Sequence, residues 1–489
     1  MIKNIFKKYW VEIILWWIIS YIWMLLFYNL WLQSFWIDEW YSSYVAKYMS
    51  IEWLYKSSYF LFEWLQALCF KLWWIDDFWA RFPSVIAHLI SVLLMYFIPT
   101  KICKNKYVGL LSALIFWLLY WELWWWRDAR FYSLLQLMLL LEIFLMQRWA
   151  DTKKTLYLNL GIILSWLWMI FHPFLYCLWA ILVCIFLFQY KKLRDFKTIF
   201  SKKYLSTRIL VIVWLAIVIF YGTLWGVLKW SLSSGLSLDA KKYYFKFYAK
   251  HLWTEMGMIT IFGVLWMFWF ILKKRWRETI FFVLPFILFI YALVIKWYLM
   301  HSRYALLMFP LMILSSAIAI FDIFKFIKSR YEKSVIAIVL VLLVWFSAHF
   351  QILPKSNYYF DYTSPQPDFK SAYASIPSWS NVISWFPTLC DWYYSWRWKC
   401  INAIRVDLIH DGKTKITKLE KEKYTKIPYI DNLDTLTSGV YYFVIDNLTA
   451  NSESINSTLY KQIRKHWKIT YESWKSYKNI FVAKVLINR

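Results

Sequence analysis

Residues 11–39 read VEIILWWIISYIWMLLFYNLWLQSFWIDE, an apolar run that ends in two adjacent carboxylates. The apolar part, about residues 11–32, is long enough to cross a bilayer as a helix. It is too long for the core of a signal peptide and has no small-residue cleavage site. A lysine-rich segment, residues 3–8, precedes it and favours a cytoplasmic N-terminus. We therefore expect Asp38 and Glu39 on the external side, where the first span ends.

The composition extends this interpretation to most of the chain. Of the 489 residues, 61% are hydrophobic and the mean hydropathy is +0.44. Soluble domains are about 45–50% apolar, so the excess excludes a disordered, collagen-like or ordinary cytosolic protein. Further spans are predicted at about 82–100, 107–125, 130–147, 155–171, 174–190, 208–228, 253–272, 279–297, 303–321 and 334–352.

The loops agree with a total of about eleven spans, because every connection predicted to be cytoplasmic is rich in Lys and Arg. The predicted fold class is an all-α polytopic membrane bundle over residues 1–353, in the plasma (inner) membrane, with residues 33–80 as an external loop of amphipathic helices. The odd count places residues 354–489 outside as an α/β domain. Strand-like runs there cover 381–384, 440–445 and 480–486, and a helix pattern covers 453–466.

Cys390 and Cys400 are the two cysteines of this tail. In an oxidising external compartment they could pair, or both could stay free. The chain has no Cys-x-x-Cys or His-Glu-x-x-His pattern, so no metal site is predicted. The formal net charge of +27 suits anionic lipids or phosphate groups. It is spread over short loops without a binding motif, which argues against nucleic acid as a partner.

The chain has 37 Trp and only 9 Gly. An average Gly content of about 7% would give roughly 34 in this length. Trp also stands where a turn favours Gly, as at Trp379 in Ile-Pro-Ser-Trp-Ser-Asn. One hypothesis is that many of these codons are UGA read as glycine in the cell. The alternative is a membrane protein with heavy aromatic belts at the interfaces.

Charged residues near the predicted external ends of the spans are candidates for chemistry. Asp38 and Glu39 could supply a general base and an orienting partner, or they could be solvated loop acids. The segment Arg127-Asp128-Ala129-Arg130-Phe131-Tyr132 is predicted on the same side. The cations and histidines expected with it are Arg81, His172, Lys296, His301 and Arg303. Such cations could bind a phosphate, or they could be anchors at helix ends.

Together these motifs resemble the GT-C class of membrane glycosyltransferases. The likeness is strongest to bacterial proteins similar to dolichyl-phosphate-mannose–protein mannosyltransferases and to the aminoarabinose transferase of lipid A. It rests on six features: Asp38-Glu39 after the first span, Leu72–Ser84 with Arg81 before the second, Ala129-Arg130-Phe131-Tyr132, His172, Arg303-Tyr304 with Pro310, and the tail segment Pro367-Asp368-Phe369-Lys370 followed by Ile376-Pro377 and Val382-Ile383, which resembles the start of an external domain. Trp74 stands where this class usually has Gly.

The resemblance implies a reaction and its partners. The donor is a sugar on a polyprenyl phosphate embedded in the membrane lipids, and the acceptor is an extracytoplasmic lipid, glycan or protein. Asp38, Glu39 and Asp128 are the implied catalytic residues, with Asp38 as the base that takes the acceptor proton. The implied binding residues for substrate and phosphate are Arg81, Arg130, Tyr132, His172, Lys296, Arg303 and Tyr304. No cofactor and no catalytic metal are implied.

Other interpretations are a protein O-mannosyltransferase specifically, a flippase or transporter of lipid-linked glycans, and a structural membrane protein with a binding tail. Transporters often show paired repeats with interrupted spans near the midplane. The sequence shows no internal repeat, and its charged residues cluster at span ends.

Overall fold

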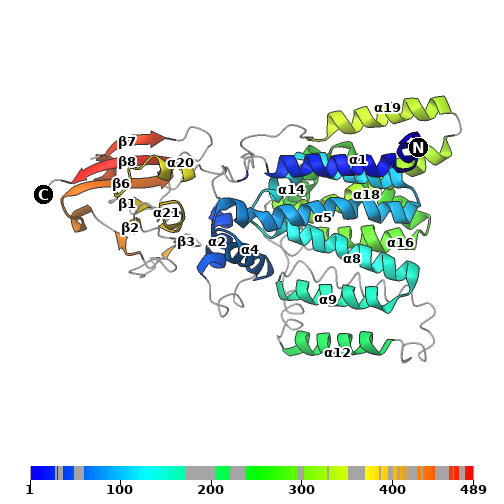
Figure 1. The fold of residues 1–489 in the computed structure, drawn as a ribbon, viewed down its shortest axis with the longest axis horizontal. Helices are drawn as coiled ribbons and strands as arrows, with labels where there is room; N and C mark the ends of the chain where they lie inside the picture. Colours follow the sequence, from blue (N-terminus) through cyan, green and yellow to red (C-terminus); the bar gives the residue numbers. More distant parts are fainter. Residues whose placement is uncertain are drawn as a thin grey trace. The chain divides into compact units, whose positions relative to one another are not determined.

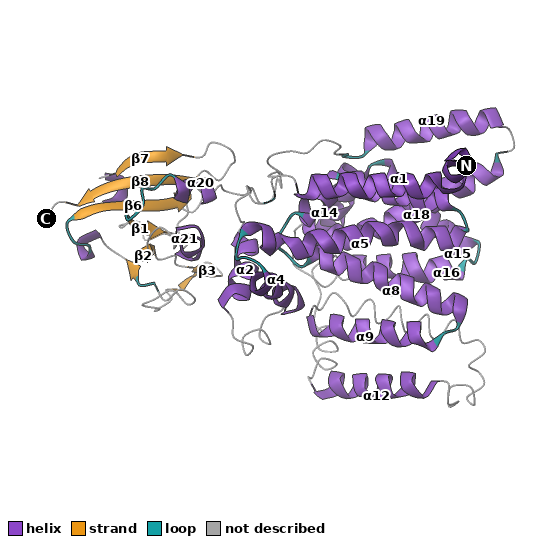
Figure 2. Ribbon diagram, in the orientation of Figure 1, coloured by secondary structure: helices purple, strands orange, loops and turns teal. Residues whose placement is uncertain are grey.

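The computed structural model of the chain is shown in Figure 1, with its helices and strands distinguished by colour in Figure 2. It describes residues 2–27, 30, 37–48, 60–171, 204–220, 238–291, 293, 302–327, 330–350, 369–384, 387–394, 400–404, 408–410, 413–415, 427–430, 433–446, 462–465, 467–472 and 480–487.

The chain divides into two compact units. The helical unit comprises Met1–Tyr28, Lys56–Phe62 and Pro83–Pro354. The mixed unit comprises Asn29–Tyr55, Glu63–Phe82 and Lys355–Arg489. Two segments that precede residue 83 therefore group with the C-terminal tail.

The helical unit is built from apolar helices that pack lengthwise, notably α15 on α18 and α8 on α9. Its helices are α1 (Ile2–Phe27), α5 (Asp77–Cys103, which begins in the mixed unit), α6 (Lys106–Leu118), α7 (Tyr120–Trp126), α8 (Tyr132–Thr152), α9 (Thr155–Phe171), α12 (Leu205–Phe220), α14 (Leu238–Met256), α15 (Met258–Leu272), α16 (Trp276–Glu278), the π-helical turn η4 (Thr279–Val283), α17 (Leu284–Ile290), the 3-10 helix η6 (Ser302–Leu307), α18 (Met308–Phe326) and α19 (Arg330–Ser347).

Within the described residues, four helices are long and apolar enough to cross a membrane: Tyr9–Phe27, Asp77–Cys103, Tyr132–Thr152 and Tyr304–Lys325. A bent pair raises the number to five if it forms one span. The count of about eleven is therefore not confirmed. The span predicted at 174–190 lies outside the described residues, and the one at 208–228 is described as far as Phe220.

The bent pair corrects the span predicted at 253–272. The apolar helix begins at Met258, since the chain turns by 116° between Lys241–Met256 and Met258–Leu272. Gly257 makes this turn with φ +50°, and a Cβ there would lie 2.1 Å from the carbonyl oxygen of Ser347. The Ser347 hydroxyl accepts a hydrogen bond from the Met258 amide at 2.8 Å. Only glycine fits this backbone without strain.

A second predicted span, 107–125, is also divided. Helix α6 ends at Leu118, and the Tyr120 amide donates to the carbonyl of His349 at 2.9 Å. His349 is itself held by Glu255, through its amide at 2.9 Å and its Nδ1 at 3.3 Å. Hydrogen bonds thus connect the break between α6 and α7, through the segment after α19, to the bend at Gly257.

The mixed unit contains a six-stranded sheet in the order β5-β2-β1-β6-β8-β7. Strands β1 (Asn381–Ser384), β2 (Cys400–Ile404), β5 (Tyr429–Ile430) and β6 (Gly439–Asp446) are parallel, and β8 (Ile480–Ile487) and β7 (Trp467–Glu472) are antiparallel. A separate hairpin pairs β3 (Leu408–His410) with β4 (Lys413–Lys415). Ile383, Phe443 and Phe481 belong to the buried core. The three predicted strand runs correspond to β1, β6 and β8, while most of the predicted helix at 453–466 lies outside the described residues.

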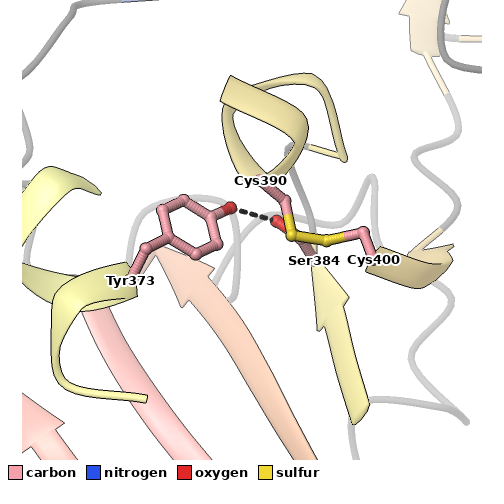
Figure 3. Close-up of a disulfide and its surroundings, with 4 residues drawn as sticks. All are labelled: Tyr373, Ser384, Cys390 and Cys400. Carbon is pink, nitrogen blue, oxygen red and sulfur yellow. Dashed lines mark hydrogen bonds between the residues drawn. A yellow bond between two sulfur atoms is a disulfide. The ribbon is translucent and has the colours of Figure 1, made fainter. Parts of the chain in front are cut away.

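The helices of the mixed unit are α2 (Ile37–Tyr48), α4 (Phe60–Leu72, mostly in this unit), α20 (Phe369–Ala374) and α21 (Pro387–Tyr394). Helix α21 follows β1 and is joined to β2 by the disulfide Cys390–Cys400, with a Cα–Cα distance of 6.2 Å. Beside it, the buried Tyr373 hydroxyl and Ser384 hydroxyl are hydrogen-bonded at 2.6 Å (Figure 3). Of the two sequence alternatives for these cysteines, the paired state is present.

Trp379 lies in the turn before β1 with φ +67°, and its side chain is 72% exposed. A bulky side chain in this backbone region is uncommon, whereas glycine adopts it freely. This conformation favours glycine at the position that the recoding hypothesis singles out.

Candidate functional site

The acid pair after α1 lies in the first turn of α2. Glu39 is fully buried and accepts two hydrogen bonds from the fully buried Arg81, at 2.8 and 3.1 Å. Arg81 also donates to the carbonyl of Leu30 at 2.8 Å. A bidentate ion pair of this kind fixes both the orientation and the position of its carboxylate. The structure thus joins two motifs that the sequence analysis selected separately.

Asp38 shares the backbone of this helical turn, while its side chain lies outside the described part of the chain. Consecutive residues on an α-helix point about 100° apart. Glu39 is committed to Arg81, so the neighbouring Asp38 stays the stronger candidate for a base.

Asp77, in the first turn of α5, is 3% exposed and forms a second polar centre in the mixed unit. Its carboxylate accepts hydrogen bonds from Lys370 Nζ at 2.9 Å, Trp392 Nε1 at 2.9 Å and the Tyr393 hydroxyl at 3.5 Å. The preceding Asp76 accepts from the amide of Trp79 at 2.8 Å and so caps α5. Partial burial raises the pKa of Asp76 above its ordinary value, partly offset by that hydrogen bond.

Lys47 connects α2 to α21. Its ammonium group lies 5.2 Å from the ring centre of Trp392. Burial lowers the pKa of Lys47, and the charge of Asp391 opposes that shift. Lys47 thus contacts α21 directly, whereas Lys370 pairs with Asp77, which accepts hydrogen bonds from α21.

The predicted Arg-Asp-Ala-Arg-Phe-Tyr segment lies in the helical unit and is almost entirely buried. Arg127 Nη1 donates to the carbonyls of Leu25 and Leu26, at 2.8 and 2.9 Å, and so satisfies the C-terminal end of α1. Asp128 is 1% exposed, and its carbonyl accepts from the amide of Arg130 at 2.8 Å. Arg127 thus has a structural role that its sequence position did not indicate.

Two predicted motifs meet in this unit. Tyr132, at the start of α8, makes an edge-to-face contact with Tyr304 of η6, at 6.4 Å between ring centres. Arg130 lies 5.4 Å from the ring of Phe131, and its carbonyl accepts from the Ser84 hydroxyl at 3.0 Å. The fold therefore brings the start of α8 to the start of the late span, 172 residues away.

Gln136 holds the same junction from within the bundle. Its amide nitrogen donates to the Glu122 carboxylate at 2.9 Å and to the carbonyl of Leu306 at 2.7 Å. Both Gln136 and Glu122 are buried. This bridge ties α7, α8 and η6 together, and nothing in the sequence pattern distinguished these two residues.

An apolar cavity of about 400 Å³ lies between α14, α15, α17 and α18. Its walls include Phe245, Tyr248, Val264, Met267 and Phe286. Helix α14 also carries lysines at 241, 242, 246 and 250. An apolar cavity beside a cationic helix suits a lipid with an anionic head group.

Several predicted site residues cannot be placed. His172 and Lys296 lie outside the described residues, and Arg303 is described only as part of the backbone of η6. Their roles stay predictions. Among the residues that the structure does describe, no group of three or more His, Cys, Asp or Glu side chains could hold a metal ion.

No protein-family model matches the chain, and no curated protein sequence matches it. Solved structures do. The chain is similar in fold to ArnT. The apo structure of ArnT from Cupriavidus metallidurans aligns with a TM-score of 0.53 at 10% identity, covering 98% of each chain.

The structure of the same ArnT bound to undecaprenyl phosphate gives a TM-score of 0.54 at 8% identity, over 95% of this chain and 97% of ArnT. The oligosaccharyltransferase of Archaeoglobus fulgidus, tethered to an acceptor peptide with the sequon NVT, gives 0.53 at 12% identity, over 98% of this chain and 74% of that one. Both are GT-C glycosyltransferases, so the resemblance predicted from the sequence motifs is confirmed at the level of the fold.

Proposed function

We propose that the chain is an integral-membrane glycosyltransferase that moves a sugar from a polyprenyl-phosphate donor to an acceptor outside the plasma membrane. The observation that carries this proposal is the whole-chain similarity in fold to ArnT, one structure of which holds undecaprenyl phosphate. The buried Glu39–Arg81 pair beside Asp38 adds a chemical reason, since a bidentate pair keeps the acid-bearing turn in one orientation.

In the proposed reaction, Asp38 takes the proton of the acceptor group as that group attacks the anomeric carbon. The bond from that carbon to the phosphate oxygen breaks, and polyprenyl phosphate leaves with the bonding electrons. Fixed cations stabilise the charge that develops on the leaving phosphate. We assign this role to Lys296 and Arg303, with Arg130 as a further candidate.

Arg81 was also predicted to bind phosphate. Because its guanidinium is bonded to Glu39 and to the Leu30 carbonyl, we assign it first to orienting Glu39. The remaining roles follow the family resemblance. We assign Asp128 a catalytic role, and His172, Tyr132 and Tyr304 a role in binding the substrate.

We propose that the polyprenyl tail of the donor binds in the apolar cavity beside α14. Its lining is almost entirely aliphatic and aromatic, as a site for an isoprenoid chain requires. The lysines of α14 suit the phosphate of such a lipid.

The test is a transfer assay with purified full-length protein in vesicles, labelled polyprenyl-phosphate sugars and cell-envelope acceptors. Asp38→Asn should lose about two or more decades of turnover if Asp38 is the base. Asp76→Asn is the matched control, because asparagine also caps a helix and should leave turnover near that of the parent. Parent-like turnover of Asp38→Asn would remove Asp38 from the role of base.

A further inference from the structure

Helix α21 of the mixed unit contacts both segments that carry the candidate acids and their partner. It packs against α2, which bears Asp38 and Glu39. Its residues Trp392 and Tyr393 also donate hydrogen bonds to Asp77, in the first turn of α5. The tail of the chain therefore contacts α2 and α5 directly.

Asp77 is the centre of this contact. At 3% exposure, a carboxylate is costly unless it is paired, and Lys370 of α20 supplies the positive partner at 2.9 Å. Lys370 is itself 36% exposed. The ion pair thus joins the head of α5 to a helix nearly three hundred residues later in the chain.

Asp77 and Arg81 are four residues apart and share one face of α5. A shift of the α5 head that follows loss of the Asp77 contact would therefore also move Arg81. Arg81 holds Glu39 by two hydrogen bonds, and Glu39 adjoins Asp38. A continuous series of contacts thus runs from Lys370 through Asp77 and Arg81 to the acid-bearing turn.

Helix α21 is itself held by the disulfide to β2 and by contacts with α2. Cys390 is fully buried and is joined to Cys400 of β2 in the sheet. On the side of α2, Lys47 stacks over Trp392 and interacts with Asp391. The Asp77–Lys370 pair does not depend on Trp392, one of the tryptophans whose identity the recoding hypothesis questions.

We infer that Asp77 and Lys370 are positioning residues for the sugar transfer: by docking the tail on the head of α5, they set the Glu39–Arg81 pair and the turn that bears Asp38. The inference rests on the proposed function and assigns a part in it to the C-terminal domain. Neither residue is assigned contact with substrate.

The experiment compares Asp77→Asn, Lys370→Met and the double variant with the parent, as full-length protein in vesicles. Misplacement of about 1 Å at a distance from the chemistry can cost about a hundredfold in rate, so each single variant should lose roughly tenfold to a hundredfold in kcat. The donor KM should stay within about twofold, since donor contacts are retained. The double variant should be no worse than Asp77→Asn, because both changes break one interaction.

Two controls separate positioning from folding. Lys370→Arg retains the charge and should recover most of the parent kcat, and Asp76→Asn removes the neighbouring charge and should behave as the parent. Amide hydrogen exchange of residues 37–48 should become faster in Asp77→Asn and stay at the parent rate in Asp76→Asn. Lys370→Met removes a partly exposed side chain and keeps the test open if Asp77→Asn does not fold.

Parent-like kcat in folded Asp77→Asn and Lys370→Met would overturn the inference. So would a loss that disappears when kcat is expressed per folded molecule. If the parent itself transfers no sugar, the proposed function fails, and hydrogen exchange then decides about the contact alone. In that case, unchanged exchange of residues 37–48 in Asp77→Asn would overturn the positioning role as well.

Discussion

Replacement of Arg81 by Met removes the positive half of a fully buried ion pair. Two hydrogen bonds to Glu39, at 2.8 and 3.1 Å, are lost together with the bond to the Leu30 carbonyl at 2.8 Å. Glu39 stays fully buried. Loss of one partner of a buried pair costs about 3–5 kcal/mol, because the other charge loses its compensation. We expect Arg81→Met to destabilise the folded protein by about that amount.

The assay is a thermal melt of purified protein in nanodiscs. At about 2 °C for each kcal/mol, as for larger domains, the midpoint should fall by roughly 6–10 °C. The double variant Glu39→Leu/Arg81→Met buries no charge and should melt above either single variant. It should nevertheless stay inactive in sugar transfer, since the turn that bears Asp38 has lost its fixed partner.

A cost below about 1 kcal/mol for Arg81→Met would refute this reasoning, because an interaction that weak is typical of solvent-exposed pairs. Suppose instead that the loss of stability in the double variant equals or exceeds the sum of the losses in the two single variants. This result would also contradict the reasoning, because additive losses mean that the two residues do not share one interaction.

Three further predictions concern the turn at Gly257, the disulfide and the identity of residue 379. Gly257→Ala should cost at least about 1–3 kcal/mol, because the turn requires φ +50° and the new Cβ would meet the carbonyl of Ser347; a thermal melt measures it. The disulfide Cys390–Cys400 joins residues with a sequence separation of 10, and its reduction should lower the stability of the mixed unit by about 2–3 kcal/mol. In a thermal melt, reductant should lower the midpoint of the parent and leave the midpoint of Cys390→Ser/Cys400→Ser unchanged. Peptide mass spectrometry of protein from the native cell should find glycine at Trp379, whereas an intact tryptophan would sink the recoding hypothesis for that position.

The sequence predicted the motifs of the site but not their partners. Asp38-Glu39 and Arg81 were recognised because the acids directly follow one apolar run and the arginine directly precedes the next. Their pairing joins residues 42 apart and depends on how α5 packs with α2. Asp77 looked like one of several loop acids. Lys370 stood in the segment Pro367-Asp368-Phe369-Lys370, which resembles the start of an external domain but did not indicate an ion pair. Neither local pattern nor composition distinguishes a charge that becomes buried from one that stays solvated.

The fold shows the same limit. Strands β1, β6 and β8 were predictable because they are apolar runs rich in β-branched or aromatic residues, whereas β5 has two residues and β7 is interrupted by polar ones. The spans were predicted from hydropathy, which is insensitive to local breaks. The bend at Gly257 and the end of α6 at Leu118 arise from hydrogen bonds with the distant end of α19.

The central claim is transfer from a lipid-phosphate donor, and the most direct measurement follows both products at once. Purified protein in sealed vesicles is given a labelled polyprenyl-phosphate sugar and envelope acceptors, and mass spectrometry quantifies free polyprenyl phosphate and glycosylated acceptor. The account predicts one polyprenyl phosphate released for each sugar transferred by the parent, and almost none with Asp38→Asn. Movement of the intact lipid-linked sugar across the bilayer, without either product, would contradict the account and identify a transporter.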